Sequence, residues 1–165
     1  RAEVDATADR IAAEGMRKVA QSYGRGPTRL VHEEKDPRGH AEFLAQLAEH
    51  DSTGAALTMR GVQRERPSLF ELEARFRRMK LPTLIICGDE DDPTLEPGLF
   101  LKRTISTSAL LVLPKCGHAM NLEDPDAFNR AVLDFVTLVD AGRWTARIPG
   151  TLGGTIIAAT PGQER

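Results

Sequence analysis

The sequence has few cysteines, no surplus of either charge and no long apolar run, and each absence excludes a class of protein. Two cysteines in 165 residues, Cys87 and Cys116, are too few for a disulfide scaffold and favour a reduced, cytoplasmic setting. Lys and Arg number 22 against 24 Asp and Glu, so a basic nucleic-acid-binding surface is not expected. No run approaches the roughly 20 apolar residues of a membrane helix. We therefore expect neither a nucleic acid nor a membrane as partner.

The first 80 residues have the periodicity of amphipathic helices and no strand pattern of their own. Apolar residues at three- and four-residue spacing predict a helix over residues 1–22. Asp36 and Ser68 can each cap the free N–H groups of a following helix, and a short helix is expected over residues 51–59. We interpret the three histidines of this stretch as solvated surface side chains: His32, His40 and His50.

The pattern changes at Leu81, where two continuous apolar runs begin. Residues 82–88 and 109–114 are short, rich in branched side chains and bounded by proline or glycine, which predicts strands buried in a parallel sheet. A helix is expected near residues 96–103, between the two strands, and another begins after Asp124. Strand, helix, strand, helix in this order indicates the α/β fold class.

Acidic side chains follow the first predicted strand, and a histidine follows the second. Gly88 is followed by Asp89, Glu90, Asp91 and Asp92, whereas His118 follows Gly117. Because ligands and catalytic groups gather beyond the carboxyl ends of parallel strands, the two loops are expected to meet. A carboxylate beside an imidazole fixes the tautomer of the ring and stabilises the imidazolium that forms during proton transfer.

These residues also carry a resemblance to a known family. The segment LPTLIICGDEDDP, followed by SALLVLPKCGHAMNLEDPDAFNRAVLDFV, resembles the C-terminal part of an α/β-hydrolase: a strand ending in Gly-x-x-Asp, a helix, a second strand, Gly-His and Glu-x-Pro. The resemblance implies that His118 is the catalytic base and Asp91 the acid, with no metal or organic cofactor. Asp92 is the rival acid, because a shift of one residue exchanges the two. Asp89 and Glu90 are expected to face solvent.

The resemblance also implies a domain organisation. Residues 1–80 correspond to the helical cap that many members insert before this segment, and residues 81–142 to the C-terminal part of the hydrolase core. Residues 143–165 form a tail, rich in Gly, Thr and Ala toward its end, that we expect to be poorly ordered.

One element of the family pattern is missing. The family nucleophile lies on a Gly-x-Ser-x-Gly turn, and none of the five serines has that setting: Ser22, Ser52, Ser68, Ser106 and Ser108. We therefore expect a fragment of a hydrolase that acts on a small ester or related acyl substrate, and that is inactive as this chain alone. Its partner would be a complementary N-terminal half or a second copy. The alternative is a non-catalytic module that acts by associating with another chain.

The two cysteines lie close in sequence to the candidate acid and base, which raises two further possibilities. Cys87, Cys116, His118 and Asp91 together suggest a zinc site or a thiol nucleophile, but their spacing matches no zinc motif. We interpret both cysteines as small buried residues at strand ends.

Overall fold

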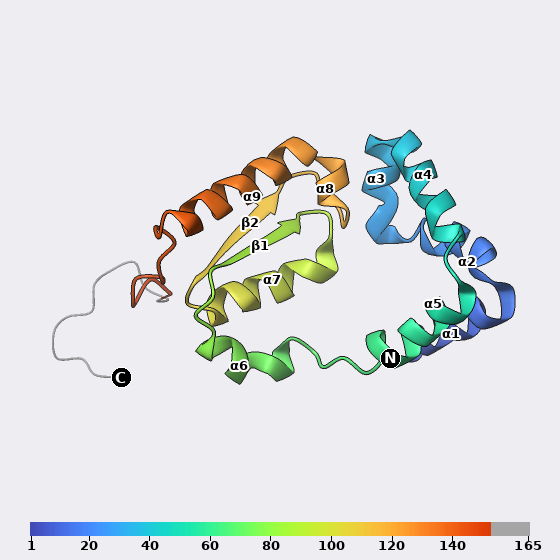
Figure 1. Cartoon of the computed structure of the whole chain (residues 1–165), viewed down its shortest axis with the longest axis horizontal. Coiled ribbons are helices and arrows are strands. Elements are labelled where there is room, and N and C mark those ends of the chain that lie inside the picture. The colour runs from blue at the N-terminus through green and yellow to red at the C-terminus, as the bar shows by residue number, and fades with distance from the viewer. Residues whose placement is uncertain (153–165) are drawn as a thin grey trace.

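The computed structural model describes residues 1–152, and these divide into two regions of different architecture. We call residues 1–80 the helical region and residues 81–142 the sheet region. In Figure 1 the helical region lies beyond the carboxyl ends of the two strands, and α6 returns the chain toward the start of β1. No helix of the described chain is long and apolar enough to cross a bilayer.

The helical region contains helices only, as the sequence predicts. Its elements are α1 (Ala2–Glu14), α2 (Met16–Tyr23), η1 (Pro27–Arg29), α3 (Leu30–Lys35), α4 (Pro37–Ala48), α5 (Ser52–Thr58), η2 (Met59–Gln63), η3 (Phe70–Leu72) and α6 (Glu73–Arg78). The expected cap at Asp36 is present, because its side chain accepts a hydrogen bond from the Gly39 N–H at 2.9 Å. Ser68 also forms its expected contact with Glu71, whose carboxylate accepts the Ser68 N–H at 2.9 Å.

Two predictions for this region are wrong. The single helix expected over residues 1–22 is two helices, because Gly15 has φ 77° and ψ 158°, a conformation that breaks the helix and that glycine adopts readily. His32 and His40 are not solvated: their side chains are 1% and 2% exposed, and their rings contact each other edge to face. His50 is exposed, as expected.

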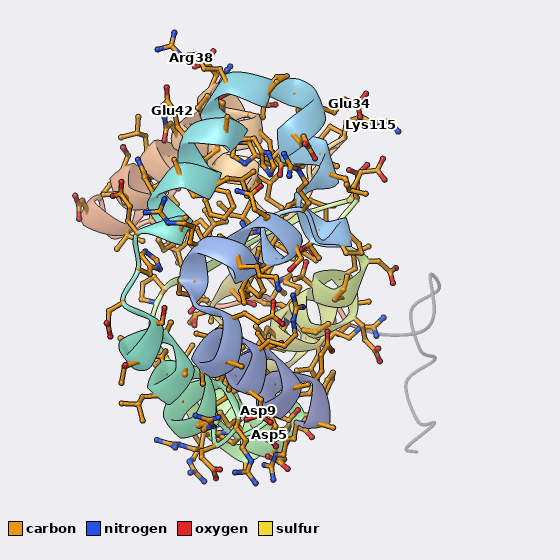
Figure 2. The ribbon with its side chains drawn as sticks, turned by 90° about the vertical axis from the view of Figure 1, so that its right-hand side faces the viewer. Asp5, Asp9, Glu34, Arg38, Glu42 and Lys115 are labelled. Atoms are coloured by element: carbon orange, nitrogen blue, oxygen red, sulfur yellow. The ribbon has the colours of Figure 1, made fainter. Side chains whose placement is uncertain are left out.

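The helical region has its own apolar cluster. Helices α1, α2 and α5 each contribute fully buried residues, namely Ile11, Met16, Val19 and Ala56. Charged side chains cover the outer surface (Figure 2), with Asp5 and Asp9 on α1 at one end and Arg38 and Glu42 on α4 at the other. Asp9 accepts a hydrogen bond from Arg60 at 2.6 Å, so α1 is tied to η2 at its surface as well as in its core.

The sheet region has the strand–helix–strand–helix order that the sequence predicts. It consists of β1 (Thr83–Gly88), α7 (Asp92–Thr104), β2 (Ser108–Leu113), α8 (Met120–Glu123) and α9 (Pro125–Asp140). The two strands pair in parallel, from Thr83 opposite Ser108 to Gly88 opposite Leu113. In Figure 1, α7 lies on one side of the sheet and α9 on the other. Within the described chain the sheet has two strands, so β1 has one unpaired edge.

The first part of the expected tail contacts the sheet region. The Trp144 Nε1–H donates to the Thr107 carbonyl at 2.7 Å, and the Arg147 guanidinium donates to the carbonyls of Lys102 and Arg103 near the end of α7. A cation at these carbonyls is favourable, because the C-terminus of a helix carries partial negative charge. Residues 153–165 lie outside the described residues.

Candidate active site

Asp91 and His118 meet at the carboxyl ends of the two strands. The Nδ1 atom of His118 lies 2.7 Å from Oδ2 of Asp91. Because an ionised carboxylate can only accept hydrogen bonds, this contact requires the ring proton to be on Nδ1. The lone pair is then on Nε2, at the opposite side of the ring. The Asp91 side chain is 1% exposed, whereas the His118 side chain is 47% exposed. The ring is therefore held at Nδ1 by a buried carboxylate, and its exposed part is open to a reactant.

The backbone turn between β1 and α7 separates Asp91 from its neighbours. Asp91 precedes the first residue of α7 and accepts the Thr94 N–H at its carbonyl, 2.9 Å away. Asp92 is already in the first helical turn and is exposed. Its charge there is favourable for the helix N-terminus, but it does not contact His118. The structure therefore places Asp91, and not Asp92, against the imidazole.

The other two acids of this loop are exposed, as expected, and the side chain of each makes one hydrogen bond with the histidine loop. Glu90 pairs with Lys115 at 3.1 Å, and this hydrogen bond raises the pKa of the Lys115 ammonium. Asp89 accepts a hydrogen bond from the Cys116 N–H at 3.1 Å. Lys115 has φ 56°, which is uncommon for a residue other than glycine, and it begins the turn that leads to His118.

The acid loop and the histidine loop are in direct backbone contact at Gly88. A Cβ atom at this position would lie 2.2 Å from the Cys116 carbonyl oxygen and 2.4 Å from that of Gly117. The Glu90 N–H donates to the same Cys116 carbonyl at 2.9 Å. Glycine at position 88 is therefore what allows the two loops to come together closely enough for Asp91 to reach His118.

The helical region reaches this site through α3 and the turn that precedes it. The Thr28 carbonyl accepts the His118 N–H at 3.2 Å, and Lys35 Nζ lies 3.7 Å from Cys116 Sγ. The buried His32 is on the same helix, and burial, followed by the neighbouring His40, lowers the pKa of its imidazole. Sequence reasoning did not identify Thr28, since a backbone carbonyl leaves no trace in the residue pattern.

Glu123 is a second contact that the sequence reasoning missed. Its side chain is 7% exposed and accepts the backbone N–H groups of Gly117 and Ala119, on either side of His118. The signal was present, because Glu123 is the Glu of the quoted Glu-x-Pro sequence, but no role was assigned to it.

The cysteines are buried free thiols, as expected. Burial raises the pKa of both the Cys87 and the Cys116 thiol, which disfavours the thiolate. The residues that the structure describes hold no group of three or more His, Cys, Asp or Glu side chains arranged to bind a metal ion.

Comparisons with known proteins relate the chain to hydrolases. It is 45% identical over 64 residues to a 2-hydroxy-6-oxononadienedioate/2-hydroxy-6-oxononatrienedioate hydrolase of Pseudomonas putida, a match to 38% of this chain and 22% of that protein. It is 37% identical over 70 residues to a 2-hydroxy-6-oxo-6-phenylhexa-2,4-dienoate hydrolase of Burkholderia cepacia, over 42% of this chain and 24% of the relative. The chain therefore matches only about a quarter of the length of these relatives.

The fold has a solved counterpart. The structure of MenH from S. aureus superposes with a TM-score of 0.74 at 21% identity, over 81% of this chain and 50% of that one. The sequence model of the alpha/beta hydrolase family matches residues 4–131, which include both the helical region and the loops that carry Asp91 and His118. The chain belongs to the alpha/beta hydrolase family.

Proposed function

We propose that this chain supplies the acid and the base of a serine-type hydrolase that acts on a small, largely apolar ester or related acyl substrate. The observation that carries the proposal is the 2.7 Å contact between the Nδ1 atom of His118 and the buried carboxylate of Asp91. A buried carboxylate that orients a half-exposed imidazole is the arrangement that activates a hydroxyl nucleophile.

The proposed chemistry has four proton transfers, two in acylation and two in deacylation. Nε2 of His118 takes the proton from the nucleophile as it attacks the substrate carbonyl, and returns that proton to the leaving group. It then takes a proton from the water that attacks the acyl intermediate, and returns this proton to the nucleophile oxygen as the acid product leaves. Asp91 keeps its charge throughout and stabilises the imidazolium. No step requires a metal or an organic cofactor.

The nucleophile in this proposal belongs to a complementary N-terminal segment. The sequence contains no Gly-x-Ser-x-Gly turn, and the chain covers half of the S. aureus structure that it resembles. Two features of the described residues favour such a segment. The outer edge of β1 has no strand beside it, and Oδ1 of Asp91 is buried without a hydrogen-bond partner among these residues.

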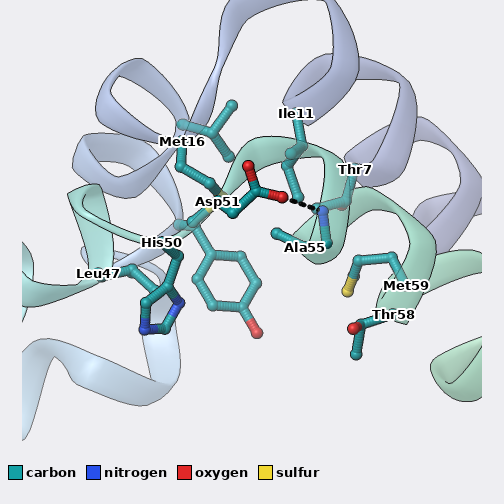
Figure 3. A pocket seen from close by; sticks show the side chains of 12 residues that line it. Thr7, Ile11, Met16, Leu47, His50, Asp51, Ala55, Thr58 and Met59 are labelled. Atoms are coloured by element: carbon teal, nitrogen blue, oxygen red, sulfur yellow. Dashed lines mark hydrogen bonds between the residues drawn. The ribbon is translucent and has the colours of Figure 1, made fainter.

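The preference for an apolar substrate rests on a hollow in the helical region, which we propose acts as the cap. A pocket of about 490 Å³ lies between α1, α2, α5 and the end of α4. Figure 3 shows Ile11, Met16, Ala55 and Met59 around it, with His50 at its margin. Its walls are mostly apolar and its volume suits a small organic molecule. All of its lining residues belong to the helical region, and neither Asp91 nor His118 is among them. That the substrate occupies this pocket is therefore itself a proposal.

A second candidate is hydrolysis of a carbon–carbon bond, which is favoured by the substrates for which two similar proteins are named. Both relatives described above are hydrolases of 2-hydroxy-6-oxo dienoates. An Asp–His pair of the same geometry can serve either reaction, so the pair does not separate them. Joined to its complementary segment, the protein would be tested against p-nitrophenyl esters and against a 2-hydroxy-6-oxo dienoate. Preference for the dienoate would replace the ester assignment with this one.

The test of the hydrolase proposal compares the chain alone with the protein that carries the nucleophile. We expect hydrolysis of a short p-nitrophenyl ester by the latter and background rates from the former. Hydrolysis by the chain alone that disappears when one of its own serines is changed would overturn the proposed division of the active site.

The unpaired edge of β1 also leads to a proposal about how the isolated chain associates. We propose that the isolated chain self-associates through the free edge of β1, or stays dispersed only with its complementary segment. Light scattering at micromolar concentration should detect particles larger than one chain, and a monodisperse monomer with a sharp melt would contradict this. We extend the proposal to a reducing, cytoplasmic setting, because Cys87 and Cys116 are both free.

A further inference from the structure

The loop that carries His118 is held by its backbone amides. Four consecutive N–H groups, those of residues 116–119, each donate a hydrogen bond. The acceptors, in order, are Asp89 Oδ1 at 3.1 Å, Glu123 Oε2, the Thr28 carbonyl at 3.2 Å and Glu123 Oε1 at 3.0 Å. One carboxylate therefore holds the amides on both sides of the histidine.

The Glu123 carboxylate uses one oxygen for each of these two amides. The side chain is 7% exposed, and no Lys, Arg or His nitrogen of the described chain lies within 4 Å of it. Hydrogen bonds to an ionised acceptor are stronger than neutral ones, and removing a buried acceptor leaves its donors unsatisfied. Among the described residues, the Glu123 side chain thus forms its hydrogen bonds with the backbone of one loop.

Helix capping explains only half of this arrangement. Ala119 is the residue before α8, so its N–H is one of the free groups that a side chain in the first turn can satisfy. The second bond goes to Gly117, which lies outside the helix and beyond His118. A carboxylate that only capped α8 would not need to span the histidine.

We propose that Glu123 is a positioning residue for His118. By fixing the backbone at Gly117 and Ala119, it fixes the Cα atom and side-chain direction of the histidine, so that Nδ1 stays at Asp91 and Nε2 faces the reactant. Packing alone constrains the ring weakly, because the side chain is 47% exposed. This inference rests on the proposed function only in naming His118 as the base. The effect of Glu123 on the contact between His118 and Asp91 can be measured by NMR without an activity assay.

The experiment uses the uniformly ¹⁵N-labelled full chain, in Glu123→Gln and Glu123→Asp variants, so that backbone amides and histidine ring nitrogens are both observed. Gln keeps the reach but presents an NH₂ group to one amide, whereas Asp keeps the charge but loses reach. In both we expect the Gly117 and Ala119 amides to exchange about 10-fold to 100-fold faster. We also expect the ring ¹⁵N signals of His118 to lose the signature of an Nδ1–H bonded to a carboxylate. A role confined to the helix would leave these ring signals unchanged.

Glu90→Gln is the matched control, because Glu90 is an exposed acid of the neighbouring loop and pairs with Lys115. It should leave both the ring signals and the amide exchange as they are. The proposal is overturned if either folded variant of Glu123 keeps the wild-type ring signals. It is also overturned if both variants lose the cooperative melt of the whole chain, because the effect would then not be specific to the loop.

An activity measurement separates this inference from the proposed function. In the protein that carries the nucleophile, Glu123→Gln should lower kcat about 10-fold or more with little change in KM. If His118→Ala leaves turnover unchanged, the proposed function fails, and the ring signals still decide whether Glu123 positions the histidine. If His118→Ala abolishes turnover while Glu123→Gln leaves kcat unchanged, the positioning role fails and the proposed function stands.

Discussion

The helical region closes an apolar cluster of its own, whereas the longest helix of the sheet region leaves its apolar residues partly exposed. Helices α1, α2 and α5 close around a cluster in which Ile11 and Val19 are 4% and 1% exposed. In contrast, none of the 16 residues of α9 is fully buried within the described chain, and Leu133 is 66% exposed. Within the region that carries the candidate chemistry, α9 is therefore the helix whose apolar face is least covered by the described residues. This difference is expected if further strands cover the sheet region, since a parallel sheet is stable when both faces are covered.

The two regions also contribute different groups to the site. The sheet region supplies side chains, Asp91, His118 and Glu123, from the ends of its strands and from α8. The helical region supplies the Thr28 carbonyl and the Lys35 ammonium. Substitutions of Asp91 or His118 should therefore affect chemistry directly, whereas the backbone carbonyl from the helical region is not removed by changing its side chain.

The largest effect is expected from His118→Ala in the protein that carries the nucleophile. Loss of the general base should lower kcat by about 10⁴-fold to 10⁶-fold. The half-exposed ring contributes little to packing, so the thermal midpoint should stay within a few degrees of wild type. The control in the helical region is Arg38→Ala, because the Arg38 side chain is exposed on α4 and lies outside the proposed pocket, and it should leave kcat unchanged. Equal losses from the two variants would remove the functional distinction between the regions.

A smaller but still large effect is expected from Asp91→Asn. Asparagine cannot hold the Nδ1–H tautomer of His118 as a carboxylate does, and turnover should fall by about 10⁴-fold. Asp92→Asn, one residue further in the first turn of α7, should change turnover less than about threefold, as expected of an exposed side chain. Steady-state kinetics of the two variants decide between them, and a greater loss from Asp92→Asn would move the acid by one residue.

Replacing a glycine by alanine should change the free energy of unfolding differently in the two regions. In Gly88→Ala the added methyl group meets carbonyl oxygens of Cys116 and Gly117, backbone atoms that cannot rotate away. We expect a loss of about 3 kcal/mol in the free energy of unfolding.

The control is Gly61→Ala in η2, where an added Cβ meets nothing within 4 Å. It should be neutral or stabilising by up to about 1 kcal/mol, because alanine favours helix. Urea titrations of both variants give the comparison. A Gly88→Ala variant as stable as wild type would show that the two loops can separate without cost.

The smallest effect is expected from lowering the pH, which should reduce the free energy of unfolding through a group in the helical region. Burial and the neighbouring His40 lower the folded-state pKa of His32 from its ordinary value of 6.5. The unfolded chain then binds the proton more tightly, so the contribution to stability is full above about pH 6.5, falls as the pH drops below it, and is lost below the folded-state pKa.

Thermal melts from pH 7.5 to 5 should record this loss, and His32→Phe should flatten the profile. His50→Gln is the control, because His50 is exposed and should leave the slope unchanged. An unaltered slope in His32→Phe would assign the acid sensitivity to other groups.

Local patterns were sufficient to predict the strand–helix–strand–helix order of the sheet region and the meeting of the acid loop with the His118 loop. A short apolar strand followed by Gly-x-x-Asp, and another followed by Gly-His, place both side chains at the same edge of a parallel sheet. The Asp36 cap was equally readable, because a cap depends on residues three or four apart. The break at Gly15 was missed because the apolar periodicity continues on both sides of it.

What the sequence determined by itself is therefore that an acid loop and a histidine loop meet at the strand ends, since this placement is encoded in neighbouring residues. The tertiary structure decided three matters that depend on segments far apart in the chain. It placed Asp91 rather than Asp92 against the imidazole, because α7 begins at Asp92. It buried His32 and His40, which lie among charged neighbours in sequence but between packed elements in space. It also brought the Thr28 carbonyl to the His118 amide across 90 residues, a contact between backbone groups that every residue possesses and that no residue pattern can therefore specify.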